Sequence, residues 1–183
     1  AASDVYKRQQ IELRVLAHLS QDSTMIEILK NKKSDIHSET ASRIFNVPIG
    51  DVTSDMRRKA KEVNFGLIYG MEAFGLSKSL DIEQKEASQL IESYFSQFPE
   101  IKGFLDNIVL KATKDSFTET LIGRKRYIRE LNSSNFQVKA AGKRIAMNAP
   151  IQGTAADIMK IAMIKVFHKI KELDQTQSII QEN

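Results

Sequence analysis

The chain has 183 residues, of which 42% are hydrophobic and 27% charged, so it can bury a globular core and is too apolar to remain disordered. It contains no Cys and therefore folds without disulfides, which fits a reducing compartment. No apolar run approaches the roughly 18–20 residues of a membrane span, and no signal-peptide pattern opens the sequence, so we expect a cytoplasmic location and no membrane partner. The net charge of +4 favours a polyanionic partner but does not require one.

The first two thirds of the sequence are predicted to be helical, because apolar residues recur every three or four positions. In chain order, helices are expected over 11–19, 24–29, 35–45, 54–70, 87–98 and 101–112. Their candidate N-caps are Thr24 (with Glu27 in capping-box spacing), Ser34 or Asp35, and Ser54 or Asp55.

The texture changes around residues 117–129, where β-forming residues on both sides of Gly123 predict a hairpin. A loop is expected at 132–135, followed by a helix to about Asn148 that Pro150 interrupts. A last helix is expected to bury one apolar stripe, made of Ile151, Ala155, Ile158, Ala162 and Val166. The sequence SII near the end could begin a strand. The predicted fold class is therefore α+β, mostly helical, with few strands.

The segment RRKAKEVNFGLIYG, residues 57–70, has two distinct helical faces. One face carries the apolar residues Met56, Ala60, Val63 and Leu67. The other face, centred about 150° away, carries Arg57, Lys61, Phe65 and Tyr69. Cations near a helix N-terminus oppose the macrodipole unless an anion binds there, and aromatic rings farther along the same face could stack on a base. A solvated basic face, with the aromatics packed on a neighbouring domain, remains the alternative.

The spacing Arg57-x-x-x-Lys61-x-x-x-Phe65-Gly66-x-x-Tyr69-Gly70 resembles the fingers-helix motif of family A DNA polymerases, the bacterial DNA polymerase I group. Three further segments resemble that family in the family's order: QIELRVLAHLS (10–20) its motif A, TLIGRKRYI (120–128) its Thr-x-x-Gly-Arg segment, and NAPIQGTAADIMKIAM (148–163) its palm helix. The resemblance implies the fingers and an incomplete palm of a right-hand polymerase. The implied organisation is 1–9 unmatched, 10–24 partial palm, 25–130 fingers and 131–183 partial palm.

The resemblance also implies site residues. Arg57 and Lys61 would be the catalytic residues that hold the triphosphate of an incoming nucleotide, and Phe65 would lie along its sugar and base. Tyr69 would stand where the templating base enters, and Glu12 beside the sugar 2′ position. The remaining implied nucleotide neighbours are Gln10, Ile11 and His37. A lone His is otherwise more often a surface or core residue, and Glu12 could simply be an exposed helix charge.

Contacts to primer–template DNA are implied for a second group of residues. Arg144, Asn148 and Gln152 recur at i+4 and match residues that meet the minor groove, where Gln and Asn can read acceptors shared by all base pairs. Arg124, Lys125 and Arg126 would contact backbone phosphates, although a charge cluster at a hairpin tip is usually just solvated.

The chain departs from the family at the metal ligands. Family chemistry calls for two divalent ions, Mg²⁺ in the parent enzyme, held by carboxylates. Lys7 stands where the family has its first metal-binding Asp, and Asp4 lies three residues away, too far to substitute simply. The sequence ends at SIIQEN, where the family's His-Asp-Glu would begin, and Glu182 is out of register. No metal ligand is therefore expected here.

The sequence predicts a fragment of a DNA-directed DNA polymerase, a nucleotidyltransferase of DNA replication and repair that is inactive on its own. Its partners would be primer–template DNA and deoxynucleoside triphosphates, and the resemblance implies a bacterial, nucleoid-associated monomer. Two alternatives stay open: a non-catalytic nucleotide- or DNA-binding helical module, and a helical protein whose basic helix docks on another protein.

Overall fold

The structure is a computed structural model that describes the backbone of residues 2–31 and 35–181 and the side chains of residues 11–31 and 35–173. Ser34, Glu182 and the side chains of Asp4, Lys7 and Gln10 lie outside that part. The elements in chain order are α1 (Ala2–Ser20), α2 (Ser23–Lys30), α3 (Ile36–Phe45), η1 (Ile49–Asp51), α4 (Ser54–Ile68), α5 (Ala73–Leu80), α6 (Gln84–Gln97), α7 (Pro99–Asp115), β1 (Phe117–Glu119), β2 (Lys125–Tyr127), η2 (Arg129–Asn132) and α8 (Phe136–Gln181). The predicted class, mostly helical with few strands, is confirmed. Helix α5 was not predicted from the sequence.

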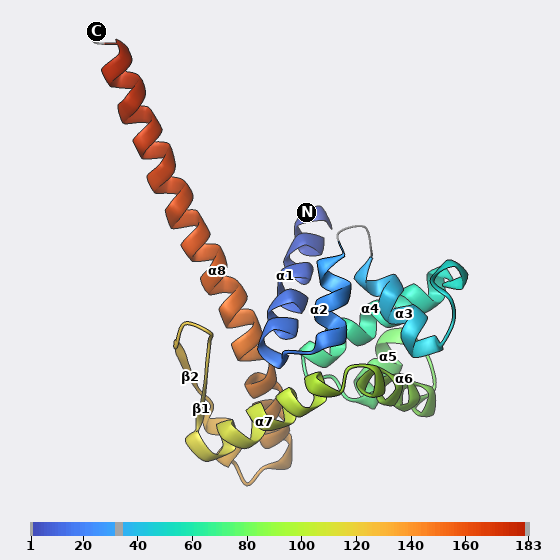
Figure 1. Cartoon of the computed structure of the whole chain (residues 1–183). Helices are drawn as coiled ribbons and strands as arrows, with labels where there is room; N and C mark the ends of the chain where they lie inside the picture. The colour runs from blue at the N-terminus through green and yellow to red at the C-terminus, as the bar shows by residue number, and fades with distance from the viewer. Residues whose placement is uncertain (1, 32–34, 182–183) are drawn as a thin grey trace.

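Helices α1 to α7 surround one main hydrophobic core, and α8 starts beside α7 and passes α1 before leaving this body (Figure 1). Leu13 of α1, Tyr94 of α6 and Phe98 between α6 and α7 are fully buried in that core. The helices pack because each buries an apolar stripe at helical spacing. A smaller cluster around Ile128 and Leu131 fills the space between α7, η2 and the start of α8.

Side chains cap the N-termini of α2, α3 and α4, although not always the expected ones. Asp22, not Thr24, caps α2, and its Oδ1 accepts a hydrogen bond from the Met25 N–H at 2.8 Å. The expected capping box was therefore wrong, because Thr24 already lies inside the helix. Asp35 caps α3 as predicted. Thr53, one residue before the expected positions, caps α4 through its hydroxyl.

Helix α8 is one continuous helix that contains Pro150, so the predicted interruption was wrong. Proline removes one i→i−4 hydrogen bond and tends to kink a helix, but here the helical backbone continues on both sides of it. Residues 178–180 also belong to this helix, which overturns the strand predicted there.

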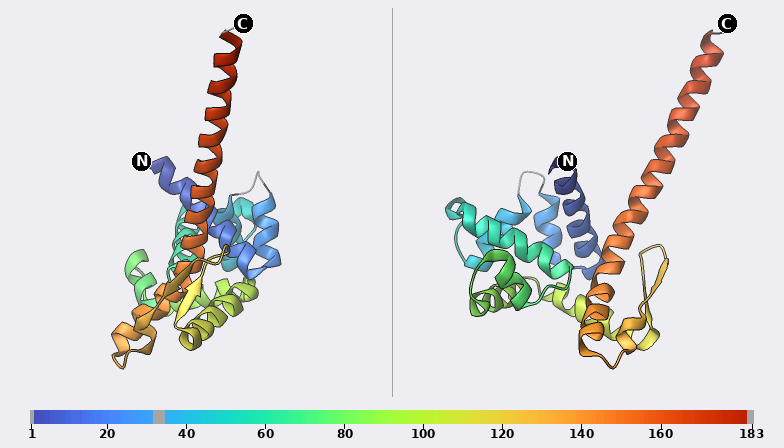
Figure 2. Two further views of the ribbon diagram at one scale, coloured as in Figure 1. Left: turned by 90° about the vertical axis from the view of Figure 1, so that its left-hand side faces the viewer. Right: turned by 180° about the vertical axis from the view of Figure 1, so that it is seen from behind.

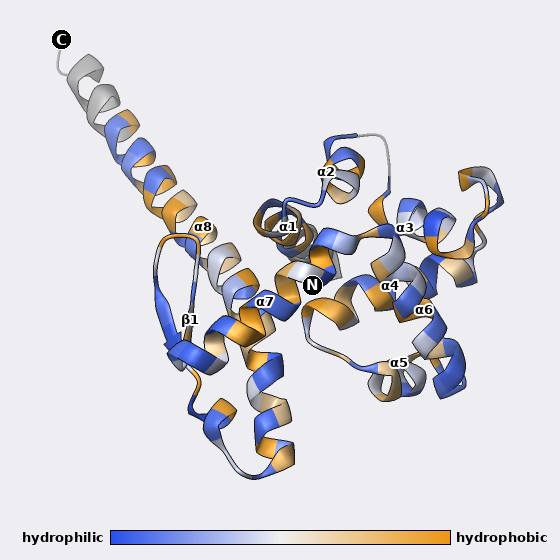
Figure 3. Ribbon diagram, turned by 60° about the horizontal axis from the view of Figure 1, so that its bottom comes forward, coloured by the Kyte–Doolittle hydropathy of each residue, from blue (hydrophilic) through white to orange (hydrophobic). Residues whose placement is uncertain are grey.

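The far part of α8 projects away from the rest of the molecule in every view (Figures 1 and 2). Ile151 and Ala155 are buried as predicted, whereas Ile158, Ala162 and Val166 are exposed, so the predicted buried stripe ends after Ala155. Orange hydrophobic residues run along the projecting part in Figure 3. The helix nevertheless does not qualify as a membrane span, and neither does any other helix of the described part.

The predicted hairpin is present, with Phe117 of β1 opposite Tyr127 of β2 in an antiparallel pair. Gly123 has φ +82° and so provides the turn. The hairpin lies along α8 and the end of α7 (Figure 1).

Candidate nucleotide-binding site

Three of the four cations at the start of α4 are paired with carboxylates. The Arg57 Nε lies 2.7 Å from Asp35 Oδ2, and the Lys59 Nζ lies 2.7 Å from Glu86 Oε1. Arg58 pairs with Asp55 one turn earlier. Lys61 has no ion pair with any residue that the structure describes. The unfavourable position of Arg57 near a helix N-terminus is thus offset by the N-cap carboxylate of α3.

Phe65 does not point away from the protein, which corrects the expected orientation of this face. Its side chain is only 7% exposed, and its ring meets His37 edge-on with centroids 5.5 Å apart. The helical angle was right, but α3 covers that side of α4. Periodicity gives the direction of a side chain relative to its own helix, and it says nothing of a second helix packed there.

His37 is a core residue, 1% exposed, and its Nδ1 lies 3.3 Å from the amide nitrogen of Asn64. Burial, with smaller contributions from the nearby Arg57 and Lys61 charges, lowers the pKa of His37 to about 4, although the Asp35 charge opposes this shift. The imidazole is therefore neutral at pH 7 and enclosed. His37 therefore has the burial and the hydrogen-bond partner of an ordinary core histidine, and its ring is not exposed at the surface.

Tyr69 lies at the meeting point of three helices. It follows α4, and its hydroxyl donates a hydrogen bond to Glu12 Oε2 of α1 at 3.1 Å. Burial raises the pKa of Tyr69, the Glu12 charge adds to that rise, and a hydrogen bond from Gln152 of α8 opposes it. Glu12 and Gln152, two predicted site residues far apart in the sequence, therefore both lie beside the Tyr69 hydroxyl.

Gly70 allows the end of α4 to lie against α8. Its φ is +66°, and a Cβ placed there would lie 3.0 Å from Arg144 Cγ and 3.2 Å from Arg144 Cα. Because the nearer obstacles include backbone, no side chain fits at this position without moving one helix. The glycine thus sets how closely Tyr69 approaches α8.

Arg144, Asn148 and Gln152 do share one face, because α8 is continuous through Pro150. Eight residues of helix separate the first from the last, about 12 Å at 1.5 Å per residue. Arg144 and Gln152 are exposed, whereas Asn148 is half-buried. Within the described residues, the buried Asn148 Oδ1 has no hydrogen-bond partner, so this amide retains an unused acceptor. Ile11, one residue before Glu12, packs against the main core.

The three hairpin cations differ in their surroundings. Arg124 folds onto α8, where its Nε and Nη2 both lie 2.9 Å from Asp157 Oδ1. Lys125 is exposed with its Nζ 4.4 Å from the centre of the Phe117 ring, and Arg126 is exposed. Neither Lys125 nor Arg126 forms an ion pair with another residue in the described ranges.

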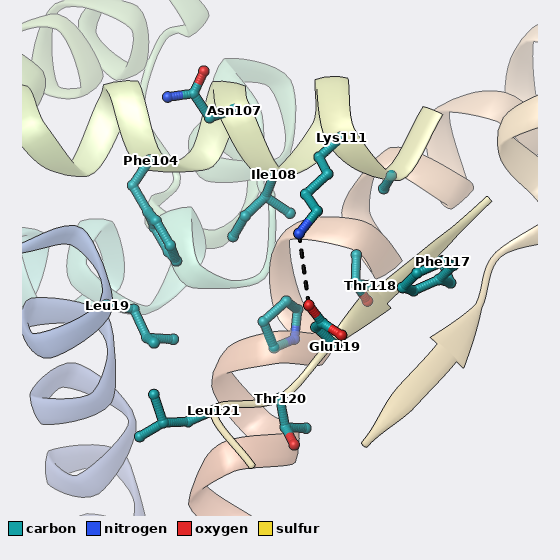
Figure 4. Close-up of a pocket in the computed structure, with 12 residues that line it drawn as sticks. Leu19, Phe104, Asn107, Ile108, Lys111, Phe117, Thr118, Glu119, Thr120 and Leu121 are labelled. Atoms are coloured by element: carbon teal, nitrogen blue, oxygen red, sulfur yellow. Dashed lines mark ion pairs between the residues drawn. The ribbon is translucent and has the colours of Figure 1, made fainter. Parts of the chain in front are cut away.

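A separate pocket of about 290 Å³ lies between α1, α7, β1 and α8 (Figure 4). Leu19, Phe104 and Ile108 line it, and a Lys111–Glu119 pair at 3.6 Å lies at its edge. Its wall is apolar and offers no cluster of cations. It is therefore not the site for a triphosphate.

Among residues 11–31 and 35–173 there is no group of three or more His, Cys, Asp or Glu side chains that could hold a metal ion. The Glu12 carboxylate accepts a hydrogen bond from the Tyr69 hydroxyl.

Comparison with known proteins identifies the family. The model of DNA polymerase family A matches residues 6–182, so the chain belongs to this family. The match includes residues 6–9, part of the segment for which no match was expected. The chain is 50% identical over 171 residues to DNA polymerase I of Caldicellulosiruptor bescii and 48% identical over 163 residues to that of Geobacillus stearothermophilus. It spans 93% and 89% of its own length in these matches, but only 20% and 18% of the relatives.

A solved structure shows the same fold. The polymerase domain of Pol1 from M. smegmatis, in complex with DNA primer-template and dNTP, matches with a TM-score of 0.84 and 49% identity over 89% of this chain and 29% of that one. The family resemblance drawn from four motifs is confirmed.

Two acidic residues of the structure were missed in the sequence. Asp157 is 4% exposed and pairs with Arg124, and no pattern in the sequence indicated this pairing. Asp22 is fully buried at the α2 N-terminus, and an Asp before Ser-Thr is a common capping pattern.

Proposed function

We propose that this chain is the nucleotide-selecting part of a DNA-directed DNA polymerase, which adds deoxynucleoside triphosphates to a primer 3′ end. The observation that carries the proposal is the hydrogen bond from Tyr69 to Glu12 at the junction of α1, α4 and α8, with Gln152 beside it. Membership of the polymerase family supports it, as does the solved relative, which is in complex with DNA primer-template and dNTP.

Lys61 and Arg57 are the proposed triphosphate contacts. Arg57 lies in the first turn of α4, where the helix dipole also favours an anion, and Lys61 lies one turn further along the same face. Lys61 offers an ammonium that is not ion-paired to any described residue, whereas Arg57 would share its guanidinium between Asp35 and a phosphate. A nucleotide would reach Phe65 and His37 only if their mutual packing opened, so we assign these two residues to supporting the α4 face.

Glu12 is the proposed sugar-selecting residue. Tyr69 fixes the Glu12 carboxylate in place, and Gln10 and Ile11 are its chain neighbours. A carboxylate held beside the sugar leaves no room for a 2′-hydroxyl, so deoxyribose fits and ribose does not. This exclusion acts on one substrate and leaves the affinity for the other largely unchanged.

The exposed face of α8 is the proposed DNA interface. Arg144, Asn148 and Gln152 lie along it, and amide groups can accept and donate hydrogen bonds to minor-groove atoms that all base pairs share. Gln152 also lies beside the Tyr69 hydroxyl, and this proximity would couple the nascent pair to the sugar site.

Catalysis by the parent enzyme calls for two divalent ions, which we propose to be Mg²⁺, but the side chains of residues 11–31 and 35–173 form no carboxylate cluster for them. Lys7 occupies the position of one family Asp, and no His-Asp-Glu occurs in the 183 residues. We therefore propose that the chain does not extend a primer by itself. Template-directed incorporation with Mg²⁺ and with Mn²⁺ tests this, and metal-dependent extension by the pure chain would contradict it.

Binding of nucleotide to the chain tests the proposed α4 face. Titration calorimetry with a deoxynucleoside triphosphate should show roughly tenfold or more weaker binding for Lys61→Ala, because one charge-assisted contact contributes about 1.5–3 kcal/mol. Lys59→Ala is the matched control, since its ammonium is already engaged by Glu86 and Asp55. Equal losses at both positions would mean that only net charge matters, as the solvated-face alternative predicts.

A further inference from the structure

The hairpin, which belongs to the segment 120–128, contacts α8 within the segment 148–163. The backbone N–H of Leu121 donates to the Thr154 hydroxyl at 3.0 Å. Arg124 reaches the same helix, with its Nη2 3.2 Å from the Gly153 carbonyl oxygen in addition to its two contacts with Asp157. A Cβ at Gly153 would lie 2.6 Å from Thr120 Cγ2, so the two elements touch with no space left over.

The surroundings of Asp157 favour an ion pair with Arg124. Burial raises the pKa of its carboxyl, but the Thr120 hydroxyl and the Arg124 guanidinium together outweigh burial, so the pKa lies below its ordinary value. An ionised carboxylate that is 4% exposed must be paired, and Arg124 is the described cation in contact with it. Removing the arginine would leave a buried charge without its partner.

Lys125 and Arg126 line a groove of about 250 Å³ between the hairpin and α8, together with Arg124 and Gln152. Arg124 differs from its two neighbours because its guanidinium is ion-paired with Asp157, whereas Lys125 and Arg126 form no ion pair with a described residue. Glu119 also lines this groove, but Lys111 neutralises it. The position of these two cations relative to Gln152 depends on how the hairpin is held.

We propose that Arg124 and Asp157 are positioning residues, whose ion pair holds the hairpin on α8 so that Lys125 and Arg126, and not Arg124, meet the phosphates of DNA. The proposal rests on the proposed DNA interface for the identity of the ligand. The positioning role of Arg124 is inferred from the geometry of its ion pair with Asp157.

The first test is amide hydrogen exchange of the 183-residue chain without DNA. Arg124→Lys keeps the charge but loses the fork that contacts Asp157 and Gly153, so protection of the hairpin amides should fall about tenfold or more. Arg126→Ala is the control, because Arg126 forms no ion pair with a described residue, and it should leave protection unchanged. If Arg124→Lys keeps wild-type protection, the positioning role is overturned.

The second test is the salt dependence of binding to a fluorescein-labelled primer–template duplex, followed by anisotropy. Each phosphate contact that is lost lowers the slope of log K against log salt by about 0.9. We expect this decrease for Lys125→Ala and for Arg126→Ala, and weaker binding at an unchanged slope for Arg124→Ala.

Asp157→Asn separates the two roles of Arg124 by sign. It removes a negative charge, so it should strengthen DNA binding if Arg124 contacts phosphate and weaken it if the pair positions the hairpin. Stronger binding, or a lower slope for Arg124→Ala, would overturn the proposal. Failure of the wild-type chain to bind the duplex would instead overturn the DNA interface, while hydrogen exchange would still decide the role of the pair.

Discussion

Helices α4 and α8 differ from the burial that their residue spacing predicted, and they differ in opposite directions. On α4, an aromatic residue expected on an open face is covered, because α3 packs over Phe65. On α8, a stripe expected to be buried is exposed beyond Ala155, because that part of the helix projects from the body (Figure 2). Hydrophobic spacing therefore shows which residues lie together on a helix, whereas the neighbouring elements decide whether that face is covered.

The difference also separates two kinds of surface. The α4 face presents cations over a buried aromatic support, as a site for a charged ligand would. The projecting part of α8 exposes apolar side chains on several sides, such as Ile164, Val166 and Phe167. A helix that is apolar on several sides is usually surrounded by protein. The two surfaces should therefore respond differently to substitution.

The largest expected contrast is between two phenylalanines. Phe65→Ala should lower the free energy of unfolding by about 3–5 kcal/mol, because it removes a ring buried against His37. Phe167→Ala, at a side chain that is 64% exposed, should change it by less than about 0.5 kcal/mol. Urea unfolding of both variants makes the comparison, and similar losses would show that the two faces do not differ as described.

The next contrast is in pH dependence. The folded protein keeps His37 neutral with a pKa of about 4, whereas the unfolded chain binds a proton near pH 6.5. Stability from this residue is therefore complete above pH 6.5 and is lost as the pH falls toward 4, about 2–3 kcal/mol by pH 4.5. His37→Gln cannot titrate and should lose less stability over that interval. Urea unfolding at both pH values measures this, and parallel losses would contradict the buried, neutral state.

A third contrast compares two glycines. Gly70→Ala should destabilise by about 2 kcal/mol, because it combines a positive φ with contact to the Arg144 backbone. Gly103→Ala, in open space on an exposed turn of α7, should stabilise by about 0.5–1 kcal/mol. Thermal unfolding with calorimetry gives both values. A neutral Gly70→Ala would mean that α4 and α8 do not approach as closely as the structure has them.

The smallest expected effect is at the projecting part of α8. Met163→Lys with Phe167→Lys should leave the free energy of unfolding within about 0.5 kcal/mol of wild type, while lowering the binding of a hydrophobic dye. A large loss of stability would show that these side chains are covered in solution.

Several features of this fold could be predicted from residues that are close together in the sequence. The α4 boundaries, the Asp35 cap and the hairpin turn at Gly123 depend on residues near one another in the chain. Helix α5 and the continuity of α8 through Pro150 were not predicted, because packing against distant elements decides them. The burial of Phe65 could not be predicted without knowing that α3 packs over it.

The candidate site divides in the same way. Motif spacing brought Glu12, Tyr69 and Gln152 forward as site residues, but their meeting at one hydroxyl depends on how three helices cross. Arg124 was recognised as a cation, whereas its pairing with Asp157 needed a contact across 33 positions of sequence. Spacing identifies the chemical groups, and tertiary structure shows which of them are already engaged.

The central claim is that Glu12, held by Tyr69, selects the sugar of the incoming nucleotide. Its most direct test uses a polymerase such as that of G. stearothermophilus in which residues 10–173 of this chain replace the matching segment and the host supplies both metal-binding aspartates. Single-nucleotide insertion is measured with matched ribo- and deoxyribonucleotides. Glu12→Ala should raise the relative kcat/KM for ribose by about 10²-fold or more, with a smaller loss for deoxyribose. An unchanged ratio would contradict the account and show that Glu12 does not stand beside the sugar.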